Sequence, residues 1–70
     1  MMVIAQKEFL MLIAEKGYSA EELAKKIGVS RLTIYNVIKR KPIRTGTAKK
    51  LCIFFEVNMM DYFELVLDET

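Results

Sequence analysis

The sequence lacks the residues from which most enzymes and metal sites are built. It has no histidine, and its only cysteine is Cys52. A single cysteine excludes an internal disulfide, and a chain without histidine is not expected to hold zinc. There is no glycine-rich phosphate loop, and no pair of carboxylates is placed for acid–base chemistry. We therefore predict that the protein is not an enzyme and uses no metal or cofactor.

Long apolar runs are also missing. No stretch approaches the length that crosses a membrane. The apolar start from Met1 to Ala5 has neither the basic residues nor the cleavage site of a signal peptide. We expect a soluble protein of the cytoplasm with no membrane partner.

Acidic residues are absent from one continuous part of the chain. No aspartate or glutamate occurs between Leu23 and Phe55. The same stretch carries nine basic residues, namely Lys25, Lys26, Arg31, Lys39, Arg40, Lys41, Arg44, Lys49 and Lys50. The flanking segments are acidic, so the formal net charge is only +2. This segregation favours a surface that meets a polyanion, although a solvated lysine-rich face would look the same by charge alone.

The length of 70 residues predicts a single domain spanning residues 1–70. A chain of this size buries only about 60% of the surface that its unfolded form exposes. Yet 53% of the residues are hydrophobic, which is more than one small core needs. We expect a partner subunit to cover the excess.

Apolar residues recur with helical spacing, so we predict an all-α fold. Five helices are expected at about residues 3–15, 20–27, 31–40, 45–55 and 59–65. For residues 64–70 the pattern leaves a frayed helix, a short strand and disorder open.

Local signals mark the helix ends. Gly17 and Gly28 suit left-handed C-caps, because glycine enters that conformation without a Cβ penalty. Ser19 and Glu22 have the spacing of a capping box, and Ser30 is the next N-cap.

The predicted helix over residues 31–40 has two opposed faces. Ile34, Val37 and Ile38 are spaced to face the core. The other face holds Leu32, Tyr35, Asn36 and Lys39, with Arg31 beside it at the N-terminal end. Together with the preceding short helix and the turn at Gly28, residues 20–40 form a predicted helix-turn-helix unit.

Two segments resemble the Cro and lambda-repressor class of DNA-binding domains, also called the XRE family. They are SAEELAKKIGVSRLTIY at residues 19–35 and TAKKLCIFFEV at residues 47–57. The resemblance implies a compact five-helix domain of prokaryotic or phage origin. It also implies that the helix over residues 31–40 enters the major groove of double-stranded DNA.

The resemblance and the chemistry of the side chains together suggest the DNA contacts. We assign Arg31, Leu32, Tyr35 and Asn36 to base edges, since Arg31 suits guanine, Asn36 adenine and Leu32 a thymine methyl. Six residues are assigned to phosphates: Ser19, Ser30, Thr33, Lys39, Lys41 and Arg44. For Thr33 and Tyr35 the alternative contact, base for phosphate or the reverse, stays open.

The surplus of apolar residues predicts a homodimer. Its interface is assigned to Ile53, Phe54, Met59, Val66 and Leu67. We expect a Cro-like repressor that binds a palindromic operator as a dimer, with no small-molecule effector. The alternative is an antitoxin or anti-repressor that uses the same fold to bind another protein.

Overall fold

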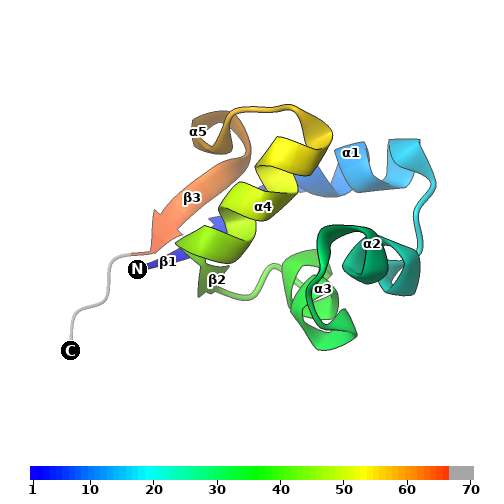
Figure 1. Cartoon of the computed structure of the whole chain (residues 1–70). Coiled ribbons are helices and arrows are strands. Elements are labelled where there is room, and N and C mark those ends of the chain that lie inside the picture. Colours follow the sequence, from blue (N-terminus) through cyan, green and yellow to red (C-terminus); the bar gives the residue numbers. More distant parts are fainter. Residues whose placement is uncertain (67–70) are drawn as a thin grey trace.

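The computed structural model describes residues 1–66, which form five helices and three short strands. In chain order these are β1 Met2–Ala5, α1 Lys7–Lys16, α2 Ala20–Ile27, α3 Arg31–Ile38, β2 Ile43–Arg44, α4 Thr45–Phe55, α5 Met59–Tyr62 and β3 Phe63–Val66. Figure 1 shows the strands gathered at the end of the molecule that holds the N-terminus, with α2 and α3 at the opposite end.

The prediction of an all-α fold is wrong, because the three strands form an antiparallel sheet. The strand order is β2-β1-β3, so the N-terminal strand lies in the centre. Val3 lies opposite Ile43 on one side and Leu65 on the other. Val3 and Ala5 are buried while Met2 and Ile4 are only half-buried, which is the alternation of a strand with one face on the core.

The sheet also changes the ends of two predicted helices. The helix expected over residues 3–15 begins only at Lys7, and the helix expected over residues 59–65 stops at Tyr62. In both places the removed residues belong to strands that pair with each other. An apolar run of four residues does not distinguish strand from helix, and here the distant pairing partner decides.

The local helix signals are confirmed. The helices predicted over residues 20–27 and 45–55 have these bounds. Gly17 and Gly28 take left-handed conformations, with φ of 77° and 85°. The helix predicted over residues 31–40 ends two residues early, at Ile38, because Arg40 itself adopts a left-handed φ of 57°.

One hydrophobic core joins the sheet to the helices. Phe9 of α1 is fully buried at its centre. Its ring meets Phe55 of α4 at 5.4 Å between centroids, Phe63 of β3 at 4.8 Å and Tyr62 of α5 at 6.0 Å. The core therefore depends on an aromatic cluster that draws on both ends of the sequence.

Candidate nucleic-acid interface

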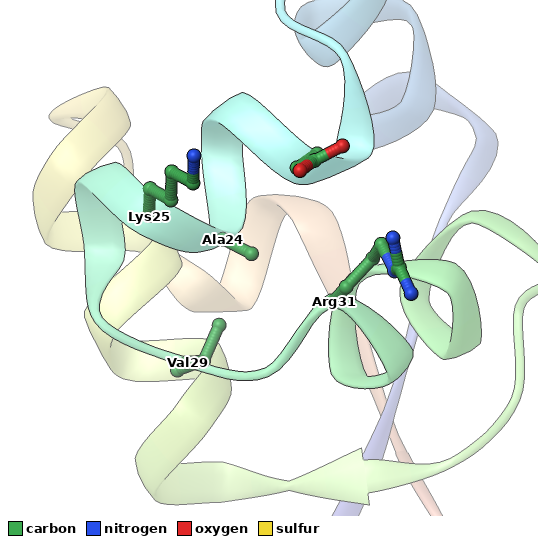
Figure 2. Close-up of a pocket in the computed structure, with 5 residues that line it drawn as sticks. Ala24, Lys25, Val29 and Arg31 are labelled. Atoms are coloured by element: carbon green, nitrogen blue, oxygen red, sulfur yellow. The ribbon is translucent and has the colours of Figure 1, made fainter.

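The turn between α2 and α3 is built by a few short contacts. Gly28 donates its N–H to the carbonyl of Ala24 at 2.8 Å, and Val29 donates to the same carbonyl at 3.0 Å. Ala24 is 4% exposed, so the small side chain leaves room for the turn to fold back over α2. Figure 2 shows the side chain of Val29 directed across this turn toward α2, on which Ala24 lies. These contacts fix where α3 begins.

The start of α3 is held by its own cap. Ser30 accepts a hydrogen bond from the Thr33 N–H at 3.2 Å, and the two hydroxyls are 2.8 Å apart. This confirms Ser30 as the N-cap. The hydroxyls of both residues are therefore partly occupied within the protein, and the free N–H groups of the first turn remain directed outward along the helix axis.

The start of α2 is capped by a full capping box. Glu22 donates its N–H to the Ser19 hydroxyl at 3.1 Å, and Ser19 donates its N–H to the Glu22 carboxylate at 3.0 Å. These bonds hold the pKa of Glu22 below its ordinary value, chiefly through the Ser19 backbone N–H. Because this carboxylate stays ionised, the Ser19 helix start carries a negative charge as well as free amides.

A hollow of about 260 Å³ lies between α2 and the start of α3. Its lining residues are Glu21, Ala24, Lys25, Val29 and Arg31. In Figure 2 the guanidinium of Arg31 extends from the first turn of α3, and Lys25 extends from the last turn of α2. The hollow thus separates two cations at the edge of the helix-turn-helix unit.

The structure leaves the predicted base-reading residues of α3 on its outer side. Leu32 is 67% exposed and Tyr35 is 44% exposed. Arg31 is also exposed, whereas Asn36 is half-buried. Ile34 and Val37 are fully buried beneath them, as the spacing predicts. Four side chains of different chemistry therefore lie on one accessible side of α3, and Ile34 and Val37 on its opposite side pack into the core.

Ile38 does not follow the prediction. It was assigned to the buried face, but 40% of its surface is exposed. Ile38 is the last residue of α3, where the chain leaves the helix. The exposed side of α3 therefore carries three large apolar residues, Leu32, Tyr35 and Ile38.

Basic residues follow α3 closely. Lys39, Lys41 and Arg44 are all exposed, in the turn after the helix and in β2. The Lys41 N–H donates to the Asn36 carbonyl at 2.8 Å, which folds this turn back onto α3. Lys39 and Lys41, both predicted to bind phosphate, are thus brought beside the C-terminal end of α3, and Arg44 follows in β2.

Arg40 makes a hydrogen bond that the sequence did not reveal. Its Nε donates to the carbonyl of Ala5 in β1 at 3.1 Å, across 35 residues of sequence. The charge count includes Arg40 but gives no sign of this bond, since the carbonyl belongs to a strand that was predicted as helix.

Residues 1–66 contain neither a membrane-spanning helix nor a metal-binding cluster. None of the helices in this part is long and apolar enough to span a membrane. No group of histidine, cysteine, aspartate and glutamate side chains there could hold a metal ion. Burial raises the pKa of the Cys52 thiol, so this cysteine stays protonated as a buried apolar side chain.

The fold and this surface define a helix-turn-helix DNA-binding domain. Residues 8–68 match the family model of the Cro/C1-type HTH DNA-binding domain, and the chain belongs to this family. Comparison with curated proteins and with solved structures gives no significant match. Family membership confirms the resemblance seen in the sequence and identifies double-stranded DNA as the partner of a transcription regulator.

Proposed function

We propose that the protein is a Cro-like repressor that reads a palindromic operator with α3 in the major groove. The observation that carries this proposal is the outer face of α3. It presents a cation, an amide, a phenol and an aliphatic side chain from one rigid helix, in a stretch without acidic residues. A major groove is wide enough to admit such a helix and offers a distinct pattern for each base pair.

Each base-reading residue has a chemical match. Arg31 can donate two hydrogen bonds to the O6 and N7 atoms of guanine, and Asn36 can pair with N6 and N7 of adenine. Leu32 is costly to expose to water, and a thymine methyl would cover it. Tyr35 lies on the same accessible face and can contact the neighbouring base edge.

The phosphate contacts flank this face. Lys39, Lys41 and Arg44 neutralise backbone charge at the C-terminal end of α3. The free amides after Ser30, assisted by Thr33, bind a phosphate at the N-terminal end. The contact at Ser19 is weaker, because the Glu22 carboxylate already accepts from the Ser19 N–H and the Ser19 hydroxyl already accepts from the Glu22 N–H.

Selection of duplexes from a random library, followed by binding measurements at two salt concentrations, tests the function. We expect the selected operator to be palindromic and to bind about 10³-fold or more tighter than random DNA. Binding should weaken as salt rises, since phosphate contacts release counterions. Equal affinity for selected and random DNA would contradict a sequence-specific repressor.

We propose that the protein forms a homodimer, supported by apolar surface away from α3. Ile53 is 67% exposed on α4, and Met59 lines an apolar hollow of about 220 Å³. Phe54 is half-buried against Tyr18, and Val66 is half-buried at the end of β3. Leu67, assigned to the same interface, lies outside the described residues.

Sedimentation of the whole chain at tens of micromolar tests the dimer. We expect twice the monomer mass, and we expect Ile53→Asp to shift the equilibrium toward monomer. Lys49→Asp, which changes an exposed residue of the same helix outside the assigned interface, is the control for charge alone. A monomer at this concentration would rule the dimer out.

An antitoxin or anti-repressor remains the second candidate, favoured by exposed methionines. Met60 is 90% exposed and Met11 is 69% exposed, and methionine adapts well to protein surfaces. Such a module would show no preference for the selected operator, so the same binding measurement separates the two functions.

A further inference from the structure

Arg40 occupies an unusual position directly after the recognition helix. It is one of two residues other than glycine with a positive φ within residues 1–66, the other being Glu56. This left-handed conformation is disfavoured for any residue with a Cβ atom. Something in the surrounding structure must therefore hold Arg40 there.

Two backbone bonds supply that constraint, from the Arg40 N–H to the Val37 carbonyl at 3.0 Å and from the Lys41 N–H to the Asn36 carbonyl at 2.8 Å. The Arg40 side chain adds a bond to a distant strand. Its Nε donates to the Ala5 carbonyl at 3.1 Å in a partly buried setting. The other side-chain hydrogen bonds of the described residues all join positions three apart in sequence. Arg40 thus makes the one side-chain hydrogen bond in this part of the chain that links distant elements.

The geometry of the sheet explains why Ala5 needs this donor. Backbone groups in an antiparallel strand point alternately to its two neighbours. Gln6 donates to Tyr62 on the β3 side, and Met1 accepts from Thr45 on the β2 side. The odd-numbered residues of β1 therefore direct their backbone groups toward β2.

Strand β2 is too short to serve Ala5. It contains only Ile43 and Arg44, and Val3 already lies opposite Ile43. Continuing this register would bring Lys41 opposite Ala5, but the Lys41 N–H donates to Asn36 instead. Ala5 is 1% exposed, and a buried carbonyl without a donor is costly. The Arg40 guanidinium takes the place of the missing strand residue.

We propose that Arg40 is a positioning residue for base recognition, acting as a side-chain extension of β2 that fixes the end of α3 to the central strand. This role rests on the repressor function proposed above. It adds to that function a residue that affects sequence specificity without contacting a base. The bond joins Arg40, the second residue after α3, to β1, the central strand of the sheet. The tilt of α3 in the groove thereby depends on the sheet.

The test compares Arg40→Lys with the unchanged chain, using the selected operator and random DNA at one salt concentration. Lysine keeps the charge but places a methylene where arginine has its Nε, so the bond to Ala5 is lost. We expect the ratio of operator affinity to random-DNA affinity to fall about tenfold, the size of one mismatched base pair, while random-DNA affinity stays nearly constant. Lys49→Arg, an exposed change outside the site, should leave the ratio unaltered.

An unchanged ratio in Arg40→Lys, or an equal loss on both DNAs, would overturn the positioning role. If the parent chain itself shows no operator preference, the proposed repressor function fails instead. If Arg40→Lys does not fold, NMR spectroscopy of the unchanged chain tests the hydrogen bond directly. The Arg40 Nε–H should give an NMR signal protected from solvent exchange, with a scalar coupling through the hydrogen bond to the Ala5 carbonyl carbon. A rapidly exchanging Nε–H without this coupling would also overturn the proposal.

Discussion

Phe9→Ala is expected to lower the free energy of unfolding by about 3–5 kcal/mol. Phe9 is fully buried and its ring meets Phe55, Tyr62 and Phe63, so alanine would leave a cavity lined by three aromatic rings. Domains are stable by only about 5–15 kcal/mol in total. Removal of this one side chain would therefore cost a large part of the free energy of unfolding.

Urea unfolding followed by circular dichroism measures this effect. Met11→Ala, on the same helix but 69% exposed, is the matched control and should change the free energy of unfolding by no more than about 0.5 kcal/mol. A loss below about 1 kcal/mol for Phe9→Ala would mean that the aromatic cluster is not the centre of the core.

Arg31→Ala should weaken operator binding by about 1–3 kcal/mol and relax the preference at one base pair. The expected cause is the loss of a bidentate contact with guanine, which no other residue of α3 can replace. Affinity for random DNA should fall much less. The measurement is a competition series in which each operator position is varied in turn.

Lys41→Ala is the matched comparison, since it also removes one exposed cation near α3. We expect it to weaken binding to all sequences alike and to lower the salt slope by about one unit. A preference relaxed at one base pair by Lys41→Ala, together with a uniform loss for Arg31→Ala, would mean that the two roles are exchanged.

The helices could be predicted because their signals are local. The Ser19 capping box, the Ser30 cap and the turn at Gly28 each depend on residues within five positions of one another. Burial then follows the 3.6-residue period, as in Ile34 and Val37. Where short-range chemistry decides the backbone, the sequence is sufficient.

The sheet could not be predicted, because its cause is distant in sequence. Met2–Ala5 becomes a strand only because Phe63–Val66 returns to pair with it. Arg40 and Glu56 take left-handed conformations at positions where glycine would be the usual signal. The bond from Arg40 to Ala5 depends both on a partner distant in sequence and on a left-handed residue that is not glycine. No pattern within a short stretch of sequence could therefore reveal it.

The sequence predicts those parts of the candidate DNA surface that come from one continuous segment. The gap in acidic residues and the polar side of α3 are features of one continuous segment. The early end of α3 and the exposure of Ile38 depend on the turn that Arg40 makes. The assigned contacts with bases, phosphates and a second subunit depend on partners outside the chain and stay predictions.

Amide chemical-shift mapping with the selected operator duplex tests the major-groove role of α3 most directly. We expect the largest changes within residues 30–44, with Arg31 and Asn36 side-chain signals shifting in slow exchange. Random duplex should shift the amides near Lys39, Lys41 and Arg44 while moving the Arg31 and Asn36 side chains little. Unperturbed signals from residues 31–41, with shifts confined to α4 and α5, would contradict DNA recognition by this helix.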